Sequence, residues 1–366
     1  FSGYRSHRPS NLAVIGGATT KFRIPCIPRI NKWQLEMLFV GFFPGYSSIR
    51  LFTYSNQRVV MRKSFLVLGL FLGLMVSCSR EESPETQPDQ TGTAGEALAL
   101  NLEVGTIPDE LAIFRSGLSK YINVFGVHII ATAATPDEKV EHAAHVMAQY
   151  LDNDANGTID DPAVVAAMVQ ARAFMVMGSD ENELESLDPE PFELAGYGAG
   201  QGLFGTETNP SVGFDASLEE VLHLITDYGY TAAYESHFGV DAGSAMTNAM
   251  DTARGGQFIE SSEEECEGGG NCALPENGYP EQAWYTYDDD TCSYNCMATE
   301  YFYWVLTSLL GAQSGRCDEI AEEWQPCTPD RVLEMDSAAH TLFTATNAGY
   351  VMPTVLPDGD YQGPTQ

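Results

Sequence analysis

The ten residues DNDANGTIDD at 152–161 carry the sharpest chemical pattern in this chain. Oxygen-bearing side chains recur at every second position, and Gly157 permits a tight turn in the middle. Calcium takes roughly six to eight hard oxygen ligands in flexible geometry, and alternating short carboxylates can supply them. Ile159 follows the turn and can pack inward. The segment therefore predicts a calcium-binding loop.

This loop resembles EF-hand-like loops in its D-x-[DN]-x-[DN]-G pattern, and its ninth position also resembles thrombospondin-type calcium repeats. The twelfth position, normally a bidentate acidic residue, is Ala163, so we expect weaker binding or substitution by Asp161. The alternative is an Asn/Asp-rich turn between helices that holds no ion. By the resemblance, the calcium ligands are Asp152, Asp154, Asn156, the Thr158 carbonyl and Asp160.

A second group of metal-ligating residue types lies on a helix expected to begin at Ser217. Glu219 and His223 are four residues apart, so they share one helix face, and Glu220 lies between them. Zinc peptidases use the pattern H-E-x-x-H in this way: the two histidines hold the metal and the glutamate activates water. The spacing predicts a metal site that needs a third ligand from another segment.

Residues 294–304 supply that segment through a resemblance to the gluzincin metallopeptidases related to anthrax lethal factor, whose third-ligand helix has the pattern E-[YF]-F-A-E. The resemblance covers roughly 200–310. It implies that a Gly-rich stretch at 203–205 is an edge strand that aligns the substrate. It further implies metal ligands Glu219, His223 and Glu300, a general base Glu220, and an oxyanion-stabilising Tyr294.

Two departures from the family pattern leave the activity open. Glu219 stands where the family has histidine, which gives two carboxylates and one imidazole, a harder set that is less typical of zinc. Trp304 replaces the second glutamate of the third-ligand helix. The alternatives are a hydrolytic site with zinc or another divalent transition metal, a degenerate metal-binding remnant, and an acidic helix start with one hydrogen-bonded histidine.

The segment 61–78 has the composition of an export signal. Met61-Arg62-Lys63 is basic, the apolar run 65–76 is too short to span a bilayer comfortably, and Ser77-Cys78 follows. The segment resembles the lipobox of bacterial lipoproteins, with Met75 where leucine is usual. The resemblance implies lipidation of Cys78 and attachment to the cell envelope, with the outer membrane expected. The alternative is a short hydrophobic core helix.

Charge divides the chain into unlike parts. The formal net charge is −33, yet ten of the 18 basic residues lie in 1–63, and 79–366 has 8 basic against 50 acidic residues. Such an acidic domain repels phosphate backbones, which excludes a general nucleic-acid binder. We expect an upstream extension foreign to the mature protein at 1–60, a signal peptide at 61–77, a flexible tether at 78–97, a globular domain at 98–350 and a tail at 351–366.

Six cysteines in the last third of the chain predict disulfides, because an even number in an exported chain is typical of an oxidising compartment. Sequence alone leaves fifteen pairings open. A thiolate zinc site is the alternative, although no CxxC pair occurs. The candidates are Cys266, Cys272, Cys292, Cys296, Cys317 and Cys327.

Hydrophobic patterning predicts a helix-dominated α+β domain with a small sheet. We expect Thr135 to cap one helix, and Ser217 with Glu220 to form a capping box on another. Expected strands lie at 122–131 and 173–177, an acidic loop at 179–191, and an extended stretch at 194–205. Expected helices lie at 135–151, 162–170, from 217 onward, and at 242–253, 298–310 and 330–344.

Two functions follow from these patterns. One is a surface-anchored metallohydrolase acting on peptides, with calcium as a second ion. The other is a non-catalytic, calcium-stabilised envelope lipoprotein with a binding or structural role. Convergence of Glu219, His223 and Glu300 within roughly 5 Å, close enough for one ion to bridge them, would favour the first.

Overall fold

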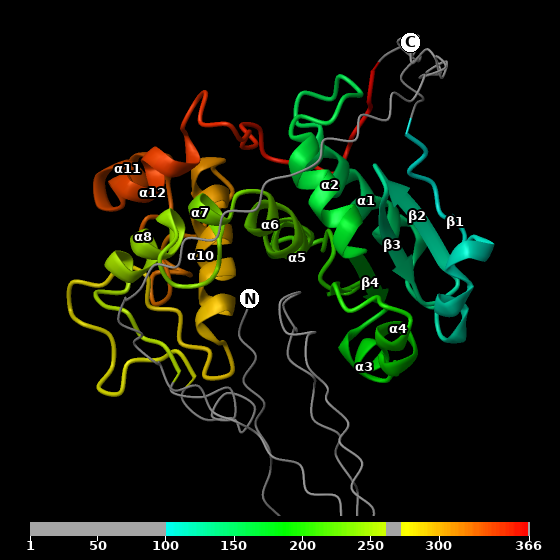
Figure 1. Cartoon of the computed structure of the whole chain (residues 1–366), viewed down its shortest axis with the longest axis horizontal. Helices are drawn as coiled ribbons and strands as arrows, with labels where there is room; N and C mark the ends of the chain where they lie inside the picture. The colour runs from blue at the N-terminus through cyan, green and yellow to red at the C-terminus, as the bar shows by residue number, and fades with distance from the viewer. Residues whose placement is uncertain (1–99, 261–271, 365–366) are drawn as a thin grey trace, which may run out of the picture. The chain divides into compact units, whose positions relative to one another are not determined.

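The computed structural model describes residues 100–260 and 272–364, which form the expected helix-dominated α+β domain with a small sheet (Figure 1). The expected extension, signal segment and tether, together with Cys78 and Cys266, lie outside these residues. Within the described ranges, no helix has both the length and the apolar character needed to cross a bilayer.

Five short strands form one mixed sheet in the order β1-β2-β3-β4-β5. The first three strands pair antiparallel, whereas β4 and β5 run parallel to β3. β5 is the last strand in this order, so it is an edge strand. Their bounds are β1 Gly105–Thr106, β2 Lys120–Val124, β3 Val127–Ala131, β4 Phe174–Gly178 and β5 Gly200–Phe204.

The single strand expected at 122–131 was wrong, because a two-residue hairpin divides it into β2 and β3. Phe125 and Gly126 form the turn with φ values of 52° and 94°. Two positive φ values match the twist of a tight hairpin, but the usual signal is Asn-Gly or Asp-Gly. A phenylalanine at positive φ is uncommon, so the residue type gave no sign of the turn.

Three helices cover one side of the sheet: α1 (Asp137–Leu151), α2 (Pro162–Ala171) and α5 (Ser217–Ile225), all to the left of the sheet in Figure 1. The two expected caps do not form, because the N-cap positions are Pro136 and Ala216 and neither helix has a side-chain cap. The Thr135 hydroxyl donates to the Met177 carbonyl, and Ser217 Oγ donates to Asp215.

A second, smaller core lies on the other side of the sheet, against the 3-10 helix η1 (Asp109–Ser116). Phe114 is fully buried there and packs its ring on Phe174 and Phe192. The segment expected as an acidic loop contains two short helices, α3 (Glu181–Glu185) and α4 (Glu190–Leu194). The side chain of Asp180 caps α3 by accepting from Glu183 N, a local signal that composition alone obscured.

Beyond α5 the chain continues through a π-helical turn η2 (Thr226–Tyr230) and the short α6 (Thr231–Ala233) into a second group of helices. α10 lies at the centre of this group, contacts α5, and is buried over most of its length. The other members of the group are α7 Glu235–Phe238, α8 Ala245–Ala253, α10 Tyr294–Leu309, α11 Pro329–Met335 and α12 Ser337–Phe343.

The helix expected at 330–344 is divided at Asp336 into α11 and α12. Asp336 has non-helical angles (φ −130°, ψ 64°), and its carboxylate caps α12 by accepting from Ala339 N. The same carboxylate accepts hydrogen bonds from Trp284 Nε1 and the Tyr301 hydroxyl. These tertiary partners favour a break that a helical pattern does not reveal.

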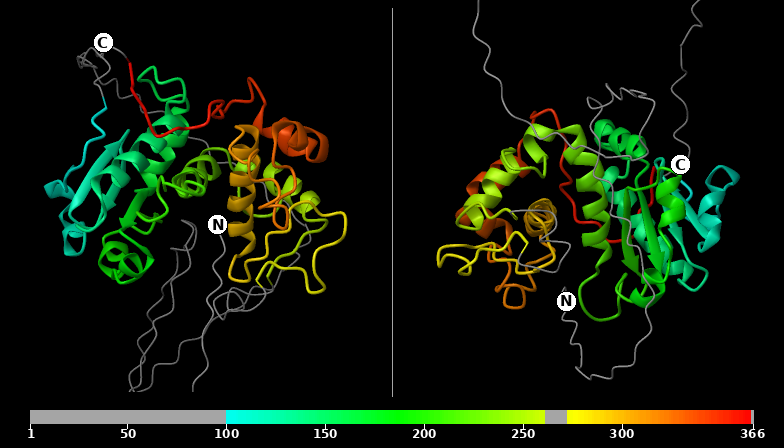
Figure 2. Two further views of the ribbon diagram at one scale, coloured as in Figure 1. Left: turned by 180° about the vertical axis from the view of Figure 1, so that it is seen from behind. Right: turned by 60° about the horizontal axis from the view of Figure 1, so that its bottom comes forward.

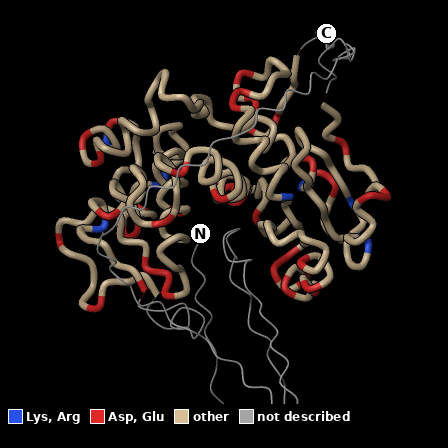
Figure 3. The backbone as a smooth tube through the Cα atoms, viewed as in Figure 1, with Lys and Arg blue, Asp and Glu red and all other residues tan. Residues whose placement is uncertain are grey.

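Disulfides in the C-terminal third are confirmed. Cys292 pairs with Cys296 and Cys317 with Cys327, at Cα separations of 5.3 and 5.4 Å, and Cys272 is also disulfide-bonded. Asp and Glu are spread over the described backbone, while Lys and Arg are few (Figure 3). The acidic character therefore belongs to the whole domain and not to one segment.

Candidate metal centre

Three of the sequence-predicted ligands converge between α5 and α10. Glu219 and His223 come from α5 and Glu300 comes from α10, and one ligand atom of each lies within 4.8 Å of the others. His223 and Glu300 are buried, at 6% and 9% exposure, and Glu219 is half-buried. The spacing therefore meets the condition for bridging by one ion.

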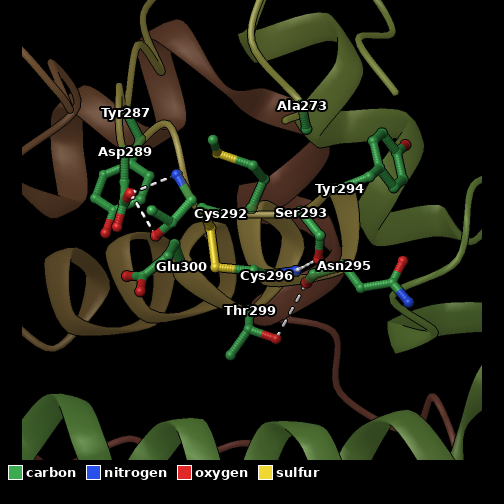
Figure 4. The surroundings of a disulfide bond; sticks show 12 residues. Ala273, Tyr287, Asp289, Cys292, Ser293, Tyr294, Asn295, Cys296, Thr299 and Glu300 are labelled. Carbon is green, nitrogen blue, oxygen red and sulfur yellow. Dashed lines mark hydrogen bonds between the residues drawn. A yellow bond between two sulfur atoms is a disulfide. The ribbon is translucent and has the colours of Figure 1, made fainter. Parts of the chain in front are cut away.

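The packing of the two helices explains this convergence. The apolar side of α5 is buried, which fixes the rotation of the helix and leaves the Glu219 and His223 side toward α10. On α10 the Cys292–Cys296 disulfide staples the first turn, one turn before Glu300 (Figure 4). The buried residues of α5 are Ser217, Leu218, Val221, Leu222, His223, Leu224 and Ile225.

Two buried ligand atoms face each other without a hydrogen bond. His223 Nε2 lies 3.4 Å from Glu300 Oε2, and neither atom has a hydrogen-bond partner among the described residues. A charge-assisted N–H···O bond would bring them to about 2.7–2.9 Å. Two ligands of one tetrahedral ion, each about 2.0–2.2 Å from the metal, are separated by about 3.4 Å. The spacing fits ligands of a shared ion better than a direct ion pair.

The electrostatics of the metal-free cluster favour bound protons. Burial, followed by the charge of Glu300, raises the pKa of Glu219 to about 8, and a hydrogen bond from Tyr303 opposes this. Burial alone would lower the pKa of His223, but the carboxylates of Glu300 and Glu220 raise it well above its usual range. A divalent cation would replace these protons, because carboxylate and imidazole bind metals in their deprotonated forms.

Metal uptake at neutral pH is therefore expected to release protons, and affinity should rise with pH toward about 8. Below the raised pKa values the ligands are protonated, and the metal must displace these protons to bind. For each proton displaced, the metal affinity falls about tenfold per unit decrease in pH. Calorimetric titration with Zn²⁺ in two buffers of different ionisation enthalpy measures the release. A titration at pH 7 without net proton release would contradict these pKa shifts.

The two residues assigned to catalysis have other contacts. Glu220 Oε2 accepts from Gln201 Nε2 at 2.6 Å and lies 3.5 Å from His223 Nδ1, the ring nitrogen opposite the cluster. The Tyr294 hydroxyl donates to Asp251 on α8 at 2.9 Å, and its side chain points away from Glu300 (Figure 4). Glu220 is therefore bound to β5, and Tyr294 ties α10 to α8.

Sequence patterns missed the residues that surround the ligands. Tyr303 follows Glu300 by three positions and so shares its side of α10, a spacing that could have drawn attention to it. Its ring stands edge-on to the His223 imidazole, with centroids 5.8 Å apart. Gln201 on β5 and Gln313 after α10 reach the site only through tertiary structure, and nothing in their sequence context marks them.

The calcium-type loop folds as a compact turn between α1 and α2. Carboxylate oxygens of Asp152, Asp154 and Asp160 lie within 4.8 Å of one another. Asp152 is fully buried and accepts from Gly157 N at 2.7 Å and Asn156 N at 3.1 Å, while Gly157 takes φ +84°. The acidic ligands predicted for the loop are therefore brought together.

Asp161 has a different role from the substitute ligand considered above. It caps α2 by accepting from Ala163 N at 3.1 Å and Val164 N at 3.3 Å. Both of its oxygens also accept from the Tyr234 hydroxyl, and one accepts from Val351 N. Both oxygens are thus engaged in holding the fold, and Asp161 is not among the three carboxylates that converge in the loop.

The C-terminal segment 351–364 lies against this loop. It has no helix or strand, but it crosses from the second helix group to α1 (Figure 2). Asn153 Oδ1 accepts from Thr354 N and Val355 N, each at 2.8 Å. Tyr361 is 6% exposed, and its hydroxyl donates to Asp152, the first residue of the loop. The loop at 152–161 thus anchors the segment 351–364.

Scans of this chain against protein-family models, curated proteins and solved structures returned no match.

Proposed function

We propose that this chain is an exported, lipid-anchored protein that binds calcium at 152–160 and a second divalent metal between α5 and α10, where it acts as a peptidase-like hydrolase. The buried atoms His223 Nε2 and Glu300 Oε2, which lie 3.4 Å apart without a hydrogen bond, carry the proposal. Two carboxylates balance the charge of a divalent ion, and with one imidazole they suit zinc or another transition metal. Such an ion polarises a carbonyl and activates water.

The surroundings of the cluster support a peptide substrate. Gln201 on β5 holds Glu220 on α5, so the edge strand runs beside the site. A peptide in extended conformation can add to such an edge through backbone hydrogen bonds. Glu220, which is not one of the three ligands, lies 3.5 Å from His223, and its role as general base requires that it exchange Gln201 for substrate or water.

Elemental analysis of the purified domain, with and without chelator treatment, tests the metal assignment. We expect calcium together with one equivalent of zinc or another transition metal, and recovery of both after add-back. Calcium alone would remove the second site.

The proposed lipid anchor is supported by the sequence signal and by the disulfides, which are typical of exported proteins. A mature N-terminus before Met61 in mass spectrometry would contradict export through this signal.

A Glu220→Gln variant is expected to lose hydrolysis of a responsive peptide by roughly 10²–10⁴-fold, the usual contribution of a general base. Metal content should stay near that of wild type, because Glu220 is not one of the three converging ligands. Peptide cleavage is followed by mass spectrometry, with Glu138→Gln, an exposed glutamate on α1, as the control. Unchanged cleavage in Glu220→Gln would end the assignment of the base.

The second candidate function is a non-catalytic, calcium-stabilised envelope lipoprotein with a binding or structural role. Two hydrogen bonds favour it, because Gln201 holds Glu220 and the Tyr294 hydroxyl is directed to Asp251. A protein that holds the second metal in stoichiometric amount, yet cleaves no peptide in a diverse pool, would have this function.

A further inference from the structure

A pocket of about 430 Å³ lies between β4, β5 and the segment of α3 and α4, and we call it the β5 pocket. Its volume is in the range of about 300–1,000 Å³ that is usual for ligand sites. It lies on the sheet face opposite Gln201, the residue of β5 that holds Glu220 on α5. The lining is mainly apolar and includes Phe174, Val176, Leu184, Leu187, Phe192 and Tyr197.

Two glycines on the edge strand leave this pocket open. Gly200 is paired with Phe174 and Gly202 with Val176, so all four residues share one face of the sheet. Because neither glycine has a side chain to cover the sheet, Val176 is only half-buried, although it is the middle residue of β4. A Cβ at Gly202 would lie 2.9 Å from Leu184, so a side chain there would displace the lining. The protein therefore leaves an apolar part of its sheet uncovered.

The same two glycines present free backbone groups at the outer edge of β5. Ala199 O accepts from Phe174 N, and Gly205 N donates to Gly178 O. Because strand residues alternate in direction, the odd-numbered residues bond to β4, and Gly200 and Gly202 direct their N–H and C=O groups outward. Among the described residues, no strand pairs with this edge. A peptide that adds here places the side chains opposite these glycines on the face of the pocket.

The rim of the pocket is acidic. The segment 180–193 contains seven acidic residues and no basic one. Two of the seven, Glu185 and Glu193, are exposed and line the pocket. In an extended peptide, residues two positions apart lie on the same face. A basic residue two positions from an apolar one can therefore meet this rim while the apolar side chain is buried, and the opposite charges favour that partner.

We propose that the β5 pocket binds an aromatic side chain of an extended peptide that carries a basic residue two positions away. This inference rests on the peptide substrate proposed above and names its class. Successive side chains of such a peptide face the pocket and the α5 side of the sheet in turn. The sheet edge thus combines recognition of the peptide on one face with access to α5 on the other.

Anisotropy of a fluorescent peptide bound to the full mature protein tests the proposal. The probe is an end-blocked heptapeptide of threonine and valine with a central phenylalanine and a lysine two positions before it. Calcium is present and no transition metal is added, so binding is measured apart from cleavage. Replacing the phenylalanine of the probe by alanine should weaken binding by about 10–100-fold, because the buried aromatic surface is lost.

A Gly198→Trp variant fills the pocket. Gly198 is exposed and lines the pocket, and an added Cβ there meets no atom within 4 Å. We expect at least tenfold weaker binding of the phenylalanine peptide and little change for the alanine peptide. The matched control is Gly315→Trp, which alters another exposed glycine whose added Cβ meets no atom within 4 Å, outside the pocket. That control should keep wild-type affinity.

A Glu185→Gln/Glu193→Gln double variant removes the charge of the rim. We expect it to bind the lysine peptide about 2–5-fold more weakly at low salt, and a glutamine version of the peptide with unchanged affinity. The control is Glu190→Gln, an exposed glutamate on α4 that does not line the pocket. It should bind the lysine peptide as wild type does.

Equal affinity for the phenylalanine and alanine peptides, or wild-type binding in Gly198→Trp, would overturn the proposal. Free phenethylamine that binds as tightly as the peptide would also overturn it, because the pocket would then take a small amine without the strand edge. Failure of the hydrolase is distinguishable from both results. In that case the protein would bind the phenylalanine peptide selectively, and added Zn²⁺ would cause no cleavage.

Discussion

A Glu300→Gln variant is expected to lose the transition metal between α5 and α10, and with it the stabilisation that this metal provides. Glu300 is one of three converging ligands and the only one from α10. Its removal should weaken binding by more than the roughly 10–100-fold typical of changes outside the ligand set. A ligand present at about 100 times its dissociation constant stabilises the native state by about 2.7 kcal/mol. Wild-type protein should therefore melt at a higher temperature after Zn²⁺ addition, and the variant should not.

The comparison for this experiment is Glu323→Gln. Burial, followed by the charges of Asp288 and Glu300, raises the pKa of Glu323 to about 7, yet Glu323 is not among the three ligands. It should keep the metal and the rise in melting temperature. Thermal unfolding with and without Zn²⁺, in excess calcium, measures both variants. A metal-dependent rise in Glu300→Gln equal to that of wild type would show that α10 contributes nothing to the site.

An Asp152→Asn variant is expected to lose calcium and to release the C-terminal segment together. The buried carboxylate accepts from Gly157 N, Asn156 N and the Tyr361 hydroxyl. In the variant an amide NH₂ replaces one of the two oxygens, and because it can only donate, it cannot accept these hydrogen bonds. Leaving such groups unsatisfied should cost on the order of 3 kcal/mol. We expect a lower melting temperature in calcium and new protease cleavage within 351–364.

Asp154→Asn is the matched change in the same loop. Asp154 is exposed, and its oxygens accept only from Asn156 among the described residues. It should weaken calcium binding but leave the segment 351–364 protected. Chelation of wild-type protein should reproduce the cleavage seen in Asp152→Asn. Equal protection of this segment in Asp152→Asn and wild type would show that the loop at 152–161 does not hold the segment 351–364 in place.

Sequence predicted the elements whose signals are local. Pro162 at the first position of α2 and the apolar period of α1 gave both helices within a few residues. The elements it missed depend on distant partners. Phe125 takes a positive φ because the sheet on both sides demands a hairpin, and Asp336 breaks a helix because Trp284 and Tyr301 bind its carboxylate.

The candidate site shows the same division. Spacing on α5 placed Glu219 and His223 on one face, and the resemblance of 294–304 pointed to Glu300. The partners that set their chemistry come from β5 and from the turn after α10, and their positions follow only from packing. Spacing also could not show that the Tyr294 hydroxyl is bound to Asp251.

The hydrogen bond from Tyr361 to Asp152 spans 209 residues of chain. Contacts of such long sequence separation form late, because the entropy of closing a large loop must be overcome first. During synthesis, the two helices on either side of the loop at 152–161 therefore exist without this contact until Tyr361 is made. A chain cut short before Tyr361 would lack this contact, even though every helix and strand of the described residues had already been synthesised.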